Sequence, residues 1–93
     1  MITEEIRWAV YMRAHGRCDV CGVVLSWQTG QAAHRVARTK WAIRKWGADC
    51  IDHPGNLAWT CPECNDAVLI TNRPIEREAL MKEIAMEMAE VRR

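Results

Sequence analysis

Two short cysteine pairs of the form C-x-x-C constrain the fold of this chain more than any other feature of its sequence. The four cysteines are Cys18, Cys21, Cys61 and Cys64. Zinc takes four such ligands in a tetrahedron, and each C-x-x-C turn places two thiolates on one ion. We therefore predict a structural Zn²⁺ that joins two distant segments. A redox pair of the thioredoxin type needs a βαβ setting, which the sequence does not show, and free core cysteines are the other alternative.

The size of the chain makes such a metal staple useful. The 93 residues have the length of one domain, 1–93, at the small end of the usual range. A core this small benefits from zinc, whose binding can add on the order of 10 kcal/mol to the folding free energy. Cys50 lies outside both pairs, and we expect it to be a buried free thiol.

The start of the chain, "MITEEIRWAV", carries acidic residues early and lacks a basic segment followed by an apolar run. We therefore expect no signal peptide. Apolar runs such as "CGVVLSW" are much shorter than a membrane span, so no membrane association is expected. These features favour a cytoplasmic protein, in which thiols stay reduced and are available to a metal.

Local signals predict an α+β domain with a helix at each end. Thr3 can cap a first helix, and Gly16 fits its end. A last helix, about 74–92, begins at Pro74, because proline is favoured in a first helical turn. Its apolar positions follow helical spacing and are Met81, Ile84, Met88 and Val91. We expect this stripe to pack in the core, with the seam of a homodimer as the alternative.

The core of the domain, about 13–70, contains several short elements. The runs "VVLSW" and "AAHRV" predict a hairpin around Gly30. "KWAIRKWG" predicts a short helix ended by Gly47, and "DHPGN" predicts a turn. A further helix is expected to begin in "CNDAVLIT", after the second cysteine pair.

The net charge of the chain is only +1, but its basic residues are unevenly placed. Five of them, with no acid among them, are Arg35, Arg38, Lys40, Arg44 and Lys45. Such a run indicates a local anion-binding face or a merely solvated one. Trp41 and Trp46 lie within it and can either stack on bases or fill a core.

The order of several features along the chain resembles the HNH endonuclease family in its zinc-stapled form. These features are the first cysteine pair, His34, the basic run, "GNLAWTC" and "CPECN". This family is also called the ββα-metal nucleases. Asn56 stands five residues before Cys61, which is the usual spacing of the family, and Asn65 follows the last cysteine at once. The resemblance covers roughly 13–68.

The resemblance implies a role for each matching residue. His34 would be the general base that activates water for attack on a phosphodiester. Asn56 would hold the base and its loop in position. Asn65 would ligate a catalytic Mg²⁺ or Mn²⁺ that stabilises the leaving oxygen. The expected DNA-backbone contacts are Arg35, Arg38, Lys40, Arg44 and Lys45.

One position departs from the family pattern. Ala33 stands where the family usually has an acidic residue or histidine that ligates the catalytic ion. The replacement ligand is left open among Asp49, Asp52, His53 and Asp66. In another register His34 would be the ligand and Arg35 would occupy the base position, where arginine cannot act as an ordinary base. We prefer His34 as the base.

Each of these residues also has a simpler interpretation. His34 can be a polar partner within the hairpin, Asn56 and His53 can be turn residues, and Asn65 can cap a helix. The function expected is a metal-dependent DNA endonuclease of phage or mobile-element type, acting alone or as a homodimer. The alternative is a catalytically inactive zinc module that binds DNA or a protein partner.

Overall fold

The computed structural model describes residues 1–91, with the backbone alone for Val91. Within these residues eight elements follow one another, of which two are strands. They are α1 (Glu4–Arg13), β1 (Gln31–His34), α2 (Lys40–Trp46), α3 (Ala48–Ile51), the 3-10 helix η1 (Pro54–Asn56), β2 (Leu57–Thr60), the 3-10 helix η2 (Pro62–Val68) and α4 (Pro74–Val91). The fold is therefore α+β, as the sequence predicts.

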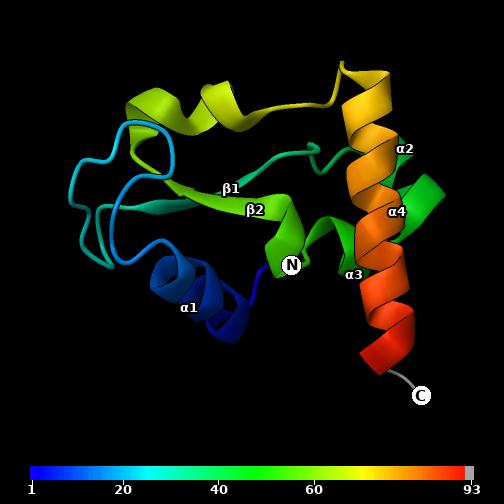
Figure 1. Cartoon of the computed structure of the whole chain (residues 1–93), viewed down its shortest axis with the longest axis horizontal. Coiled ribbons are helices and arrows are strands. Elements are labelled where there is room, and N and C mark those ends of the chain that lie inside the picture. The colour runs from blue at the N-terminus through cyan, green and yellow to red at the C-terminus, as the bar shows by residue number, and fades with distance from the viewer. Residues whose placement is uncertain (92–93) are drawn as a thin grey trace.

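The sheet consists of β1 and β2, which pair antiparallel, with Gln31 opposite Thr60 and His34 opposite Leu57. Figure 1 shows α1 and η2 against this sheet and α4 at the far end of the molecule, beside α2 and α3. The two strands come from segments separated by α2, α3 and η1, so the short sheet joins the two halves of the chain.

The hairpin predicted around Gly30 is wrong. Residues 23–27 form no strand, and Val24 makes only an isolated bridge with Arg17. β1 pairs instead with β2, which buries all four residues of β2. A close approach near Gly30 accompanies this pairing. A Cβ atom on Gly30 would lie 2.2 Å from the indole of Trp59, which is itself fully buried.

The predicted first helix, its cap and the helix in "KWAIRKWG" are confirmed. Thr3 Oγ1 accepts a hydrogen bond from the Ile6 amide at 3.1 Å and caps α1. α2 ends at Gly47, whose φ of +90° is a backbone conformation that glycine adopts without a steric penalty.

The helix expected to begin in "CNDAVLIT" is instead a 3-10 helix that starts earlier, at Pro62. The Cys64 amide donates to the Cys61 carbonyl at 3.1 Å. This i→i+3 closure brings the two cysteines of the pair together and gives the tighter 3-10 geometry.

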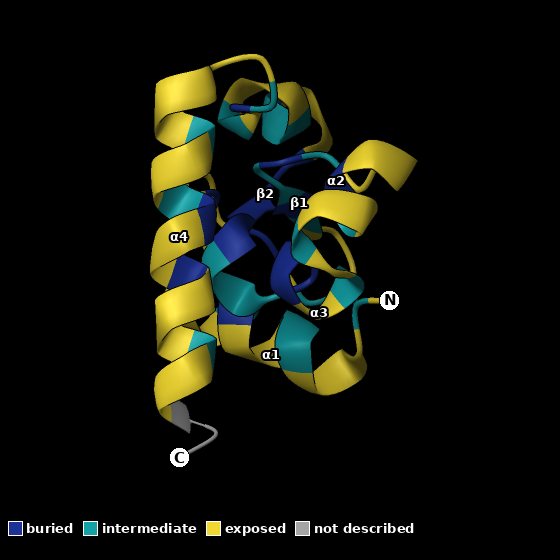
Figure 2. Ribbon diagram, turned by 90° about the vertical axis from the view of Figure 1, so that its right-hand side faces the viewer, coloured by how far each residue is buried: buried dark blue, intermediate teal, exposed yellow. Residues whose placement is uncertain are grey.

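The apolar stripe of α4 faces the rest of the chain, while its outer face is exposed (Figure 2). Met81 and Ile84 are buried and Met88 is partly buried, which confirms core packing for this part of the stripe. The side chain of Val91 and the predicted helical position 92 lie outside the described residues. α4 begins at Pro74, as expected.

Among the described residues, two apolar clusters make up the core. The first joins α4 to α2 and α3 and consists of Val36, Ala42, Cys50, Ile51, Ile70, Met81 and Ile84. The second lies under the cysteines and consists of Val10, Cys18, Leu25, Leu57, Trp59 and Cys61. Within residues 1–91, no helix is long and apolar enough to cross a membrane.

Candidate functional site

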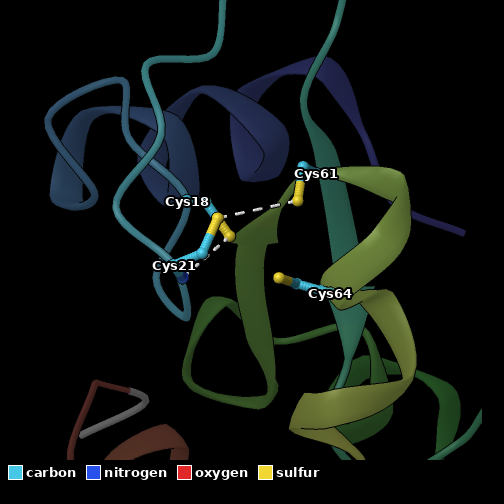
Figure 3. A group of neighbouring side chains, drawn as sticks. All are labelled: Cys18, Cys21, Cys61 and Cys64. Carbon is cyan, nitrogen blue, oxygen red and sulfur yellow. Dashed lines mark hydrogen bonds between the residues drawn. The ribbon is translucent and has the colours of Figure 1, made fainter.

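The four paired cysteines converge on one point, as Figure 3 shows. The Sγ atoms of Cys18, Cys21, Cys61 and Cys64 all lie within 4.8 Å of one another, and the Cys21 and Cys61 sulfurs are 3.8 Å apart. A tetrahedron with Zn–S bonds of about 2.3 Å has edges of about 3.8 Å. The cluster therefore has the ligand type, number and spacing that suit a structural metal such as zinc.

Backbone hydrogen bonds shape the first cysteine turn. The Val20 and Cys21 amides point at the Cys18 sulfur, at 3.4 and 3.5 Å. Asp19 fastens this turn to β2, because its amide donates to the Trp59 carbonyl at 2.8 Å and its carboxylate accepts from the Trp59 amide at 2.9 Å. Asp19 was missed by sequence reasoning, since its partner lies 40 residues away.

The thiols differ in acidity because of their surroundings. Burial by itself raises the pKa of Cys18, but hydrogen bonds from neighbouring backbone groups and from the Cys21 side chain lower it to about 6. The pKa of Cys64 rises to about 12, through a hydrogen bond with the Cys61 thiol, burial and the nearby Cys18 charge. Several thiolates at this separation repel one another, and a divalent cation among them would remove that repulsion.

A second polar group surrounds His34, at the end of β1. Its Nε2 atom lies 2.9 Å from Oδ1 of Asp52, the residue that follows α3. The Asp52 side chain is only 4% exposed and also accepts hydrogen bonds from the Met1 amino group and from Arg38 Nε, the latter at 3.2 Å to both oxygens. The structure thus brings together two residues that are 18 positions apart.

The pKa of Asp52 reflects two opposing effects. Burial by itself raises it, but the hydrogen bonds from the Met1 amino group, His34 and Arg38, with the positive charge of Arg38, lower it to about 2. Asp52 is therefore an ionised carboxylate at neutral pH, beside the imidazole of His34.

Asn56 lies next to this pair and is fully buried. Its Nδ2 donates to the Val36 and Ile51 carbonyls, at 3.1 and 2.8 Å, and its Oδ1 accepts from the Val36 amide at 2.9 Å. Val36 is two residues after His34, and Ile51 immediately precedes Asp52. One side-chain amide therefore ties the segment that carries His34 to the segment that carries Asp52.

Asn65 lies elsewhere, within η2 rather than at its cap. Its Nδ2 donates to Gln31 Oε1 at 2.8 Å, and Gln31 begins the strand that His34 ends. Three residues of strand span about 10 Å. Within residues 1–91 no hydrogen bond joins Asn65 to His34.

Of the candidate replacements for a ligand at position 33, Asp52 forms a hydrogen bond with His34. His53 lies in the segment predicted to turn, where its Nδ1 accepts from the Gly55 amide at 2.9 Å and caps η1. Asp49 and Asp66 are exposed, on α3 and η2. Ala33 is 3% exposed and lies opposite Ala58 across the sheet, so its methyl group is in the interior.

The five basic residues differ in how far their charges are compensated. Arg38 is paired with Asp52, and Lys45 Nζ lies 2.6 Å from a carboxylate oxygen of Glu78. No acidic side chain in the part of the chain that the structure describes forms an ion pair with Arg35, Lys40 or Arg44.

The two tryptophans of the basic run have different positions. They contact edge to face at 5.2 Å, and the Lys45 ammonium lies 4.8 Å from the ring centre of Trp46. Trp46 packs against the core, while Trp41 is 42% exposed. Core filling therefore describes Trp46 better than Trp41.

Cys50 is buried apart from the cysteine cluster, and its thiol lies 3.8 Å from the Met81 sulfur. Burial raises its pKa. The expectation of a buried free thiol is confirmed.

Comparison of the chain with family models, curated proteins and solved structures finds no match.

Proposed function

We propose that this chain is a metal-dependent DNA endonuclease of the HNH type, stapled by a structural zinc. The observation that carries the proposal is the His34–Asp52 pair, whose two segments are tied together by Asn56 just before β2, the strand that leads into the second cysteine pair. The order β1, connecting segment, β2 and helical turn η2, with Cys61 directly after β2 and Cys64 within η2, is compatible with the ββα order after which the family is named.

In the proposed reaction His34 takes a proton from a water molecule, and the water oxygen attacks the phosphorus of a phosphodiester. The bond from phosphorus to the leaving oxygen then breaks. A bound Mg²⁺ or Mn²⁺, with Asn65 among its ligands, would supply charge stabilisation at the leaving oxygen. The His34 side chain is 20% exposed, so it is open to solvent on part of its surface.

The basic residues support DNA as the substrate. Arg35, Lys40 and Arg44 form no ion pair with an acidic side chain within residues 1–91. Lysine and arginine contacts to phosphates give affinity without sequence preference. Arg38 and Lys45 would join these contacts while keeping their carboxylate partners.

The test is nicking of supercoiled plasmid at low salt with added Mg²⁺ or Mn²⁺. We expect wild type to nick the plasmid and His34→Ala to lose at least about 100-fold in rate, because general-base catalysis contributes roughly 10²- to 10⁴-fold. His15→Asn is the matched control, because His15 is exposed, has a φ of +55° that asparagine tolerates, and lies outside the site. All proteins are first checked for bound zinc. Equal nicking by wild type and His34→Ala would contradict the role of His34.

A second candidate function is a zinc module that binds DNA without cleaving it. Two observations favour it: the interior methyl group of Ala33 and the hydrogen bond that ties Asn65 to Gln31. With alanine at position 33, the motif positions would offer a catalytic ion few ligands. Magnesium prefers carboxylates, and neither motif position supplies one. A gel shift of DNA by wild type, with no nicking in either metal, would identify this second function.

A further inference from the structure

We propose that Asp52 is the positioning residue of His34: it holds the Nε2 proton of the imidazole and leaves Nδ1 as the nitrogen that accepts a proton. The assignment of Nδ1 as the catalytic base rests on the proposed function. The orientation of the imidazole ring is independent of the proposed function, because it follows from contacts within the protein.

The chemistry of the two partners determines which atom carries the proton. An ionised carboxylate only accepts hydrogen bonds, so the nitrogen 2.9 Å from Asp52 Oδ1 must be the donor. A neutral imidazole has one N–H group, and the other nitrogen keeps its lone pair. With Nε2 protonated toward Asp52, Nδ1 is the basic nitrogen of His34.

The position of Asp52 is itself determined by several contacts. Asp52 follows the last residue of α3, Ile51, whose carbonyl accepts from Asn56. The same amide binds both backbone groups of Val36, next to the end of β1. Arg38 Nε contacts both carboxylate oxygens and limits rotation of the carboxylate. The imidazole and the carboxylate are therefore presented to each other by one connected set of hydrogen bonds.

This arrangement also supplies a carboxylate to a site whose motif position holds Ala33. Asp52 lies 18 residues after His34 in the sequence, so no sequence pattern next to the histidine indicates that this carboxylate is its partner. Its carboxylate is committed to His34, Arg38 and the Met1 amino group. It acts through the imidazole and is not proposed to touch the substrate.

The first arm of the test needs no substrate. A long-range ¹H–¹⁵N NMR spectrum at about pH 8.5, where imidazoles are ordinarily neutral, distinguishes the two tautomers by their nitrogen shifts. We expect the Nε2–H form for His34 in the wild-type zinc-bound protein and a mixture of tautomers in Asp52→Ala. An Nδ1–H form in wild type, or an unchanged spectrum in Asp52→Ala, would overturn the inference. Should Asp52→Ala fail to fold, the tautomer of His34 in the wild-type protein is the observation that tests the inference.

The second arm measures nicking rates against pH. Asp52→Ala should lower the maximal rate by about 10- to 100-fold, as loss of an orienting partner commonly does, and Asp52→Asn should recover part of it because its amide oxygen still accepts from Nε2. Glu83→Ala is the matched control, since it also removes one negative charge, from the exposed face of α4. Unchanged rates in Asp52→Ala would overturn the positioning role. No nicking by wild type, with the Nε2–H tautomer present, would instead overturn the proposed function and support the ring orientation.

Discussion

Asp52 is a buried carboxylate in a very small domain, and it is stable there because three donors surround it. Removing an ionised group from water is costly unless hydrogen bonds and opposite charges replace the water. His34, Arg38 and the Met1 amino group provide them. Asn56 is fully buried for a similar reason: both its amide nitrogen and its amide oxygen are satisfied by the backbone.

The low pKa of Asp52 predicts a pH-dependent contribution to stability. Its pKa in the folded protein, about 2, lies below the ordinary value of 3.8. The contribution is therefore complete above about pH 5 and is lost as the pH falls toward 2. We expect Asp52→Asn to lower the free energy of unfolding by about 2 kcal/mol at pH 7, and this difference from wild type to fall by about half near pH 3.

Urea unfolding of wild type and Asp52→Asn at the two pH values measures this difference. Zinc leaves cysteine ligands in acid, but it does so in both proteins, so each comparison is made at one pH. If the free energies of unfolding of wild type and Asp52→Asn differ by the same amount at pH 7 and at pH 3, the charge of Asp52 contributes nothing to stability.

The elements of this domain are held together in two groups. The cysteine cluster joins the turn after α1 to β2 and η2, and the apolar face of α4 joins the segments around α2 and α3. Trp59 is central to the first group, because it is fully buried, contacts Tyr11 edge to face at 5.2 Å and belongs to the same apolar cluster as Cys61.

Loss of one cysteine of the cluster should disorder the first group. We expect wild type to bind about one zinc per chain and Cys64→Ser to bind it far more weakly, with unfolding and a red shift of tryptophan fluorescence as Trp59 meets water. Cys50→Ala is the control, because Cys50 lies outside the cluster. Zinc content is measured after gel filtration, and equal zinc in wild type and Cys64→Ser would contradict a four-cysteine site.

The position of α4 also bears on the predicted homodimer. Ile84 is 2% exposed within its own chain, so Ile84→Asp would disturb folding and does not test association. A dimer through α4 would have to use its outer residues, such as Ile75 and Met86, which are 88% and 58% exposed. The homodimer stays a prediction.

At the scale of the whole molecule, the distribution of charge matters more than the net value of +1. Acids compensate two of the five basic residues between 35 and 45, and within residues 1–91 Arg35, Lys40 and Arg44 form no ion pair. Lys40 and Arg44 lie one helical turn apart on α2, so both can reach the same face of a DNA backbone.

Reversal of these two charges should weaken DNA binding and its salt dependence. We expect Lys40→Glu/Arg44→Glu to lower the affinity for duplex DNA at least about 10-fold and to reduce the slope of log K against log salt by about 2, since each phosphate contact contributes roughly 0.9. Arg73→Glu/Lys82→Glu, with the same change in net charge, is the control. Fluorescence anisotropy at several salt concentrations measures both, and equal losses in the two proteins would assign the effect to net charge alone.

Local chemistry was sufficient to predict part of this structure. The Thr3 cap, the end of α2 at Gly47 and the start of α4 at Pro74 each depend on contacts or backbone preferences within a few residues. The cysteine cluster could also be predicted from the sequence, because each C-x-x-C turn arranges its own two ligands.

Tertiary structure alone decided which distant segments meet. β1 pairs with β2 rather than with residues 23–27, and this pairing buries Trp59 against Gly30. Asp52 reaches His34 across 18 residues, and Asn65 reaches Gln31 across 34. No local pattern encodes such partners, because the free energy that selects them comes from burial and hydrogen bonding between whole elements.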